Sequence, residues 1–397
     1  MPAALRRTST IGQANLAGVL NHEDLRARAR RALPLGLWQF VDGGAEDEIT
    51  LARNTRAFQE LCFQPRMGVW HPAPRLKTRI FGLEVSMPIL TAPCGGLRQL
   101  HPEGDLGVAR AAARAGTVQI TSSASGHTLE EIAAIDGPKW FQLYRFWGRQ
   151  GMESLVGRAQ AANYRALVVT IDSPVSGSRE RDLRYAFRST RLSPRRALAL
   201  APQLLPRPRW VWRYWRDGMP FGLANTAPIG PGGRPLPLSA MGQSGPESLC
   251  ASWEEIAWIR DLWHGPLVVK GVLSGEDARR AVASGADGVI VSNHGGRQLD
   301  GAPATIDVLP RIVEAIGEES EILLDSGVRR GADVVKAMAL GAGAVLVGRP
   351  YVWGLAAAGQ AGVEHMLGLL RADMVRTLQL IGCAAVEDLD ASWLTYA

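Results

Sequence analysis

The sequence of 397 residues is poor in lysine and cysteine and has no long uncharged hydrophobic stretch. Only four of its 44 basic residues are lysines, and its cysteines (Cys62, Cys94, Cys250 and Cys383) are far apart, without the spacing of paired metal ligands. We therefore expect reduced thiols, no metal site and no disulfide framework. No apolar run approaches the roughly 18 residues that a membrane-spanning helix needs. No secretory signal is evident either, so we expect a cytoplasmic protein.

The net charge of +6 is concentrated in one part of the chain. Between Arg179 and Arg216 the sequence has eleven arginines but only two acidic residues, Glu180 and Asp182, so the remainder is slightly acidic. A nucleic-acid-binding protein would combine a basic face with a recognisable binding module, and no such module is present. We therefore expect no nucleic-acid partner.

Short apolar runs alternate with helical patterns along most of the chain, which is typical of βα units on a parallel sheet. Eight such strand–helix steps predict a closed (β/α)₈ barrel, a TIM barrel of the α/β class, rather than an open sheet. The predicted strands are 88–93, 118–122, 140–144, 166–172, 267–271, 288–293, 321–325 and 344–348. The predicted helices include 104–115, 151–162, 275–284, 305–316 and 331–340.

Two segments do not fit this repeat. Residues 1–87 precede the first strand and are predicted to form a helical N-terminal cap. Residues 185–250, rich in Pro, Arg, Trp and Gly, form a long insertion or lid between the fourth and fifth strands, and a connection of this length is usually functional or mobile. We expect a single domain over 1–397, with the barrel formed by 88–184 and 251–397.

Polar residues follow each predicted strand, at the end of the barrel where reactive groups gather. They are Cys94 and Gly95, Ser122, Gln142 and Tyr144, Thr170 and Asp172, Lys270, His294 and Arg297, Asp325 and Arg329, and Gly348 and Arg349. Any one of them is compatible with a buried structural polar group, but together they predict a site.

The most informative segment is 292–301, which reads SNHGGRQLDG. His294 ends a buried strand, two glycines after it allow a ligand to approach the backbone, and Arg297 follows. A neutral imidazole can accept a proton from a hydroxyl group, and a guanidinium can hold a carboxylate through two parallel hydrogen bonds. This combination predicts proton abstraction from a hydroxy acid.

This segment resembles the active-site motif of the FMN-dependent 2-hydroxy-acid oxidases and dehydrogenases, which include glycolate oxidase, lactate oxidase, and the lactate and mandelate dehydrogenases. The resemblance extends over nearly the whole chain, from 33–54 to 362–383. It implies oxidation of a 2-hydroxy acid to a 2-oxo acid, with FMN as cofactor and His294 as base. The electrons then pass from FMN to oxygen or to a carrier.

The resemblance also implies roles for individual residues. The implied catalytic residues are His294, Asp172, Tyr144, Arg297 and Arg179. The implied FMN-binding residues are Cys94, Gly95, Ser122, Gln142, Thr170, Lys270, Ser292, Asp325, Gly327, Arg329, Gly348 and Arg349. Loops after the seventh and eighth strands commonly bind phosphate in such barrels, and a lysine near the flavin stabilises its reduced anionic form.

Three residues depart from the family pattern. Phe40 stands where a tyrosine usually contacts the substrate carboxylate, Ala124 where some members have a large aromatic residue, and Cys94-Gly95 where Thr followed by Ala or Gly is usual. These differences predict a roomier pocket than one for glycolate or lactate. Phe40 and the long insertion leave open a modified peptide as an alternative substrate. A barrel that keeps FMN without catalysis is a third reading, and the intact set of His294, Arg297, Asp172 and Lys270 argues against it.

Residues 206–216 in the insertion interleave arginines with Trp and Tyr. Such side chains favour a membrane surface, where rings lie at headgroup depth and cations meet anionic lipid. The segment predicts peripheral contact with the inner face of the membrane and a carrier such as a quinone as acceptor. The alternative is a lid whose aromatic side chains pack on the barrel. The resemblance also implies a homo-oligomer, a tetramer in many members.

Overall fold

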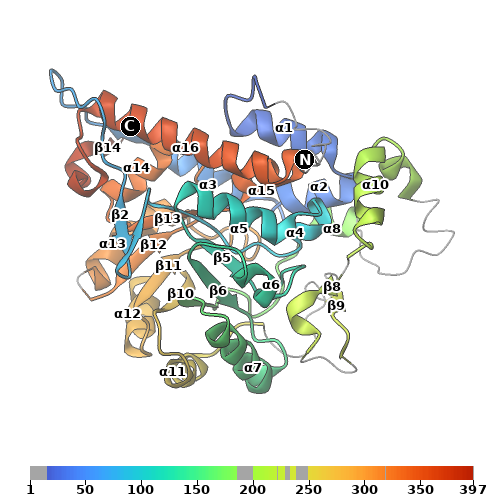
Figure 1. Ribbon diagram of the computed structural model, residues 1–397. Coiled ribbons are helices and arrows are strands. Elements are labelled where there is room, and N and C mark those ends of the chain that lie inside the picture. The colour runs from blue at the N-terminus through green and yellow to red at the C-terminus, as the bar shows by residue number, and fades with distance from the viewer. Residues whose placement is uncertain are drawn as a thin grey trace, which may run out of the picture.

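The computed structural model describes residues 16–185, 200–220, 222–228, 233–237, 249–317 and 319–396. Eight parallel strands form a closed barrel at its centre (Figure 1), and their order around the barrel is β10-β11-β12-β13-β4-β5-β6-β7. They are β4 (Ile89–Thr91), β5 (Gln119–Ser122), β6 (Lys139–Leu143), β7 (Ala166–Thr170), β10 (Leu267–Val272), β11 (Gly288–Val291), β12 (Glu321–Leu324) and β13 (Ala344–Val347). All eight predicted strands are confirmed, and with them the (β/α)₈ barrel.

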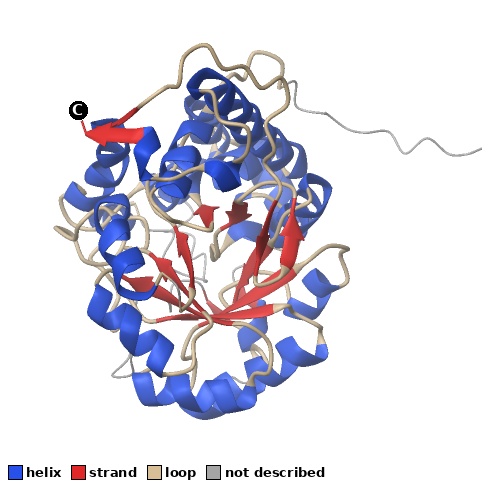
Figure 2. Ribbon diagram, turned by 90° about the vertical axis from the view of Figure 1, so that its left-hand side faces the viewer, coloured by secondary structure: helices blue, strands red, loops and turns tan. Residues whose placement is uncertain are grey.

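Helices follow the strands and surround the barrel (Figure 2). They are α4 (Leu97–Leu100), α5 (Gly104–Ala115), α6 (Leu129–Ala133), α7 (Gly148–Ala161), α8 (Glu180–Arg184), α11 (Trp253–Leu262), α12 (Gly275–Ala283), α13 (Thr305–Ile316), α14 (Gly331–Ala339), α15 (Arg349–Ala358) and α16 (Gln360–Ile381). Side-chain caps fix several starts: Ser252 and Glu255 form a reciprocal capping box on α11, and Ser274 caps α12. The predicted bounds of α5 and α13 agree with the structure residue for residue.

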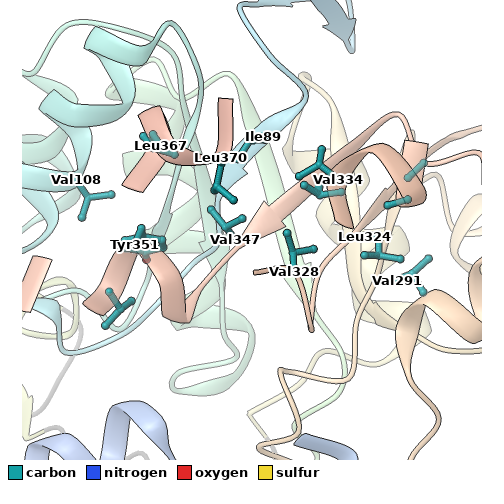
Figure 3. Close-up of a cluster of buried hydrophobic side chains, with 14 of the residues drawn as sticks. Ile89, Val108, Val291, Leu324, Val328, Val334, Val347, Tyr351, Leu367 and Leu370 are labelled. Carbon is teal, nitrogen blue, oxygen red and sulfur yellow. The ribbon is translucent and has the colours of Figure 1, made fainter. Parts of the chain in front are cut away.

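The strands alternate between two apolar layers. Ile120, Val168 and Ile290 point into the barrel, where they pack with one another, whereas their sequence neighbours face the helices. Figure 3 shows part of the outer layer, in which Val347 and Leu324 from the strands lie near side chains of the surrounding helices. This packing fixes the strand ends, and therefore the side chains that follow them.

The N-terminal segment is helical only in part. Three helices, α1 (His22–Ala32), α2 (Leu35–Asp42) and α3 (Ile49–Glu60), agree with the predicted cap. After them β1 (Leu61–Phe63) pairs with β14 (Leu394–Tyr396), which follows the short 3₁₀ helices Val386–Asp388 and Ala391–Trp393. The predicted helical cap is therefore present in α1, α2 and α3, but the residues after Glu60 form short strands instead of a helix.

A β-hairpin made of β2 (Thr78–Ile80) and β3 (Leu83–Val85) occupies the rest of that segment. Its turn residues Phe81 and Gly82 both have positive φ, as the tight turns of hairpins require. Ile80 and Val85 join the apolar layer inside the barrel, and the Phe81 ring lies 5.5 Å from that of Trp140. The hairpin thus covers one end of the barrel.

The described part of the insertion contains α10 (Pro208–Arg216), the short strands β8 (Gly222–Leu223) and β9 (Leu236–Pro237), and the 3₁₀ helix Ala224–Thr226. Residues 186–199, 221, 229–232 and 238–248 of the insertion lie outside the described residues. Trp210 and Tyr214 on one face of α10 are buried, and the Trp210 indole donates a hydrogen bond to the Gln99 carbonyl at 3.0 Å. On the other face Trp212 and Trp215 are 57% and 60% exposed. Trp210 and Tyr214 therefore agree with a lid packed on the protein, whereas Trp212 and Trp215 are exposed, as a membrane-contacting segment requires.

No helix in the part of the chain that the structure describes is long and apolar enough to cross a membrane. Within the same residues no group of three or more His, Cys, Asp or Glu side chains is placed to hold a metal ion. The domain boundaries given above remain a prediction.

Candidate active site

One pocket opens at the carboxyl ends of the barrel strands, with about 1310 Å³ of space that no protein atom fills, including its open mouth. Most of the predicted site residues line it: Cys94, Gly95, Ser122, Tyr144, Arg179, Lys270, His294, Arg297, Asp325, Gly327, Arg329, Gly348 and Arg349. Asp172, Gln142, Thr170 and Ser292 are hydrogen-bonded to these residues or to one another nearby. The structure thus brings together all the residues that the sequence singled out.

His294 lies between a carboxylate and a phenol. Its Nδ1 is 2.9 Å from Asp172 Oδ1, and its Nε2 is 3.4 Å from the Tyr144 hydroxyl. The carboxylate accepts a hydrogen bond from Nδ1–H, and this contact turns Nε2 toward Tyr144 and the pocket. The backbone of His294 is left-handed, with φ of 58°, and Gly295 and Gly296 continue at 67° and 70°. This sharp turn directs the imidazole into the pocket.

The carboxylate beside His294 is held in its ionised form. Burial by itself would raise the pKa of Asp172, but the attraction of His294 and Lys270 and the hydrogen bonds from His294 and Ser173 lower it. Burial, followed by the charge of Asp172, raises the pKa of Tyr144. At neutral pH the imidazole therefore faces a carboxylate on one side and a protonated phenol on the other.

Arg297 is anchored from the N-terminal cap. Its Nη1 donates hydrogen bonds to the carbonyls of Phe40 at 2.7 Å and Gly43 at 2.9 Å, and the guanidinium lies 5.0 Å from the centre of the Phe40 ring. Burial and the nearby Arg179 lower the pKa of Arg297 to about 9. Arg179 has its own partner, Asp182, at 3.2 Å. A pocket with two adjacent guanidinium groups is suited to a carboxylate ligand.

Lys270 belongs to a buried polar network beside the imidazole. Its Nζ lies 3.0 Å from Asp325 Oδ2 and donates a hydrogen bond to Ser292 Oγ at 2.7 Å. The same Ser292 oxygen accepts a hydrogen bond from the His294 backbone amide. Burial opposes the charge on Lys270, but Asp325 and Asp172 outweigh it and raise the pKa of Lys270. The ammonium is therefore a permanent positive charge at the wall of the pocket.

A second chain of hydrogen bonds crosses three neighbouring strands. Ser122 Oγ donates to Gln142 Oε1 at 2.9 Å, and Gln142 Nε2 donates to Thr170 Oγ1 at 2.8 Å. All three side chains are buried at the ends of β5, β6 and β7. Because each amide atom has a partner, the orientation of Gln142 is fixed.

The family model of the FMN-dependent dehydrogenases matches residues 29–396. This chain belongs to the FMN-dependent 2-hydroxy-acid oxidase and dehydrogenase family. The L-lactate dehydrogenase of Pectobacterium atrosepticum is 40% identical over 376 residues, which cover 94% of this chain and 95% of that protein. The crystal structure of the monotopic membrane protein (S)-mandelate dehydrogenase is 41% identical, with a TM-score of 0.88, and covers 95% of this chain and 99% of that one.

The predictions of the family, of an enzyme and of FMN as its cofactor are confirmed by these comparisons. Hydroxy-acid oxidation is also better supported than the alternative of a modified peptide. The pre-mycofactocin synthase of Mycobacterium tuberculosis is also similar, at 41% identity over 366 residues, which cover 91% of each chain. The family model spans residues 29–396, and the three relatives cover 91% to 95% of this chain, so the family assignment rests on nearly the whole chain.

The pocket of this flavoenzyme fits the anionic end of FMN. Arg349 Nη1 and Nη2 donate to the carbonyls of Gly295 at 2.9 Å and Gly43 at 2.8 Å, whereas its buried Nε has no partner. Burial lowers the pKa of both Arg329 and Arg349 to about 10, and the two cations also repel each other at Arg349. Among the residues that the structure describes, neither Arg329 nor Arg349 forms an ion pair with a carboxylate of the pocket wall. A phosphate group would supply the missing negative charge.

Part of the pocket wall is apolar. Phe40, Leu97, Leu100, Ala124, Val175 and Leu249 all line it. Gly95 lies directly against Ala124, since a Cβ on Gly95 would approach the Ala124 Cβ to 3.0 Å. Both positions therefore contribute little side-chain volume, which agrees with the roomier pocket that Ala124 predicts.

Three further contributions to the site had no assigned role in the sequence. Ser326 Oγ accepts a hydrogen bond from the Gly295 amide and donates one to Asp325, and so connects two loops. Asn54 and Asn293 form a reciprocal amide pair across the cap. Gln298 binds the loop that carries Asp172. Gln298 and Asn293 lie within the motif around His294, so the sequence could have indicated a role for them. Nothing in the sequence near Asn54 indicates its role.

Proposed function

We propose that this flavoenzyme oxidises a 2-hydroxy acid with a large apolar, preferably aryl, side chain, and that His294 is the base. The observation that supports this most directly is the Asp172–His294–Tyr144 arrangement, in which the imidazole has one nitrogen on a carboxylate and the other facing the pocket. Asp172 stabilises the imidazolium that forms when His294 takes a proton. Tyr144, whose hydroxyl is close to the same nitrogen, is placed to contact the substrate hydroxyl.

Arg297 and Arg179 hold the substrate carboxylate in this proposal. Arg297 uses Nη1 for the cap carbonyls, which leaves its other nitrogens for a ligand. Because the Phe40 ring carries no hydroxyl, it supports the guanidinium through its face and backbone carbonyl but gives no hydrogen bond to the carboxylate. The two arginines therefore carry carboxylate recognition without a phenol.

Bound FMN would accept the two electrons removed from the substrate. Its phosphate would be held by Arg329, Arg349 and the backbone at Gly327 and Gly348, which line one end of the pocket. Lys270, Gln142, Thr170, Ser122 and Ser292 are the polar groups available to the ring, together with Cys94 and Gly95. The fixed ammonium of Lys270 would stabilise negative charge at the ring.

A substrate panel tests the proposal. The FMN-bound enzyme is mixed anaerobically with glycolate, lactate, mandelate and long-chain 2-hydroxy acids, and loss of flavin absorbance gives the rate constant of flavin reduction for each. Aryl and long-chain acids should reduce the flavin faster than glycolate does. A clear preference for glycolate would contradict the large-substrate assignment, and no flavin reduction by any 2-hydroxy acid would contradict the proposed reaction.

We also propose that α10 attaches the enzyme to the inner face of the membrane and that the electrons pass to a membrane carrier such as a quinone. The solvent-facing side of α10 presents Trp212 and Trp215, whose rings stack 5.4 Å apart, and the neighbouring Val211 and Leu205 are exposed as well. Arginines flank these residues, so the surface has the composition of an interfacial helix. The similar (S)-mandelate dehydrogenase is itself described as a monotopic membrane protein.

Co-sedimentation with anionic vesicles tests this attachment. Trp212→Ser with Trp215→Ser should abolish binding while leaving the buried Trp210 in place, and binding by the unaltered enzyme should weaken with salt. Trp70→Ser is the matched control, since Trp70 is 76% exposed on a different loop. Equal binding by all variants would exclude α10 as the attachment site. The oligomeric state remains the predicted homo-oligomer.

A further inference from the structure

We infer that Gln298 is a positioning residue that sets the Asp172 carboxylate against His294. The inference rests on the proposed role of His294 and adds a residue to which no role has been given. Gln298 lies four residues after His294, and its side-chain Nε2 donates hydrogen bonds to the carbonyls of Asp172 at 3.0 Å and Val175 at 3.3 Å. Its Oε1 accepts a hydrogen bond from the Gly177 amide at 3.0 Å. One amide side chain thus holds the loop after β7 at three points.

The two loops are also in direct backbone contact beside this amide. A Cβ on Gly177 would lie 2.4 Å from the Arg297 carbonyl oxygen and 2.6 Å from that of Gln298. Gly177 does not have a positive φ, so its small size is required by the contact and not by its own conformation. The close approach and the three hydrogen bonds therefore act together.

On its opposite side, Asp172 packs against the end of β10. It follows the end of β7 by two residues and packs on Gly271, where a Cβ would lie 2.6 Å from the Asp172 Cβ. The far end of the same loop is fixed separately, because the Ser178 carbonyl accepts a hydrogen bond from Glu46. Gln298 is thus the side chain of the His294 loop that fixes the near end of the Asp172 loop.

The position of Asp172 matters because a single 2.9 Å contact joins it to His294. Loss of the amide allows the loop to move away from Gly177 and Val175, and the carboxylate moves with it. Misplacement of a supporting group by about 1 Å commonly lowers an enzyme's rate by 10- to 100-fold. Gln298 lines the pocket, but its side-chain hydrogen bonds go to the loop after β7 and not to Lys270 or to the arginines at the phosphate end, so FMN should still bind.

Gln298→Met tests the inference, because methionine keeps the length of the side chain and removes its hydrogen bonds. Gln160→Met is the matched control, since Gln160 also donates to a backbone carbonyl, that of Leu262 at 2.7 Å, but on α7 away from the pocket. Both FMN-bound variants are examined by hydrogen exchange of 172–179, by thermal unfolding, and by the rate of flavin reduction at saturating substrate.

In Gln298→Met we expect faster exchange within 172–177 and a rate of flavin reduction about 10- to 100-fold lower, with FMN still bound. Gln160→Met should change neither. A variant that only loses stability would have a lower unfolding temperature and an unchanged rate in the folded enzyme, and that result would overturn the inference. So would unaltered exchange of the loop.

Gly177→Ala provides an independent route, because the added methyl group forces the loops apart while Gln298 is intact. It should reproduce both the faster exchange and the slower flavin reduction, and a wild-type rate would contradict the inference. The exchange measurement needs no substrate. It therefore separates failure of this inference from failure of the proposed reaction, which would appear as no flavin reduction in the unaltered enzyme.

Discussion

Replacement of Arg349 by methionine separates two opposing effects that the structure assigns to this side chain. In the protein without FMN, the change removes hydrogen bonds to the Gly295 and Gly43 carbonyls, each worth about 1.5–3 kcal/mol for a charged donor. It also removes a buried cation that is repelled by Arg329, and this relief offsets part of that loss. The free energy of unfolding without FMN should therefore change less than the two hydrogen bonds alone would indicate.

Binding of FMN should respond more strongly. The unpaired Nε of Arg349 is a free donor for a phosphate oxygen, and one such charged hydrogen bond contributes about 1.5–3 kcal/mol. We therefore expect Kd for FMN to rise roughly 10- to 150-fold in Arg349→Met. Quenching of flavin fluorescence during titration of the apoprotein measures Kd directly, and thermal unfolding with and without FMN measures the linked stabilisation.

Arg53→Met is the control, because Arg53 is 57% exposed on α3, where it pairs with Asp307. Its Kd for FMN should equal that of the unaltered protein. If Arg349→Met binds FMN as tightly as this control, the assignment of the phosphate to this end of the pocket is wrong. A large loss of apoprotein stability with unchanged Kd would show that Arg349 serves only to join the Gly43 and Gly295 loops.

Three further predictions concern the buried charges of the site. His294→Ala should lower the rate of flavin reduction by about 10²–10⁴-fold while the bound FMN keeps its absorbance, and a rate near that of the unaltered enzyme would exclude His294 as the base. The pKa of Asp172 is below its ordinary 3.8, so the stability it contributes is complete above that pH and is lost as the pH falls through the lowered value. Urea unfolding on both sides of pH 3.8 should show this loss of stability, and Asp172→Asn should no longer show it. If the two proteins lose stability identically as the pH falls, Asp172 is not its source. Lys270→Met should cost about 3–5 kcal/mol because it leaves the Asp325 carboxylate buried and unpaired, and Lys270→Met with Asp325→Leu should recover much of that loss in the same assay.

The sequence by itself determined the barrel. The continuous apolar runs at 166–170 and 267–269 could only be strands covered on both faces, and the repeated strand–helix order allowed one closed arrangement. Because parallel strands place their carboxyl ends on one side, the polar residues that follow the strands had to meet there. This is why His294, Asp172 and Lys270 were predicted together although they are far apart in the chain.

Tertiary structure alone decided the contacts between segments with no local relation. The cap carbonyls that hold Arg297 are more than 250 residues away from it, and no pattern near Phe40 or Gly43 indicates such a contact. The composition of 206–216 left open a membrane-contacting segment or a lid on the barrel, and the contact of Trp210 with Gln99 decides which face of α10 is buried. The hairpin at 78–85 is an example of the same kind: its apolar residues are too few to identify a strand until the open end of the barrel provides a surface for them. Local sequence sets which conformations a segment can adopt, and the surface that it meets after folding selects among them.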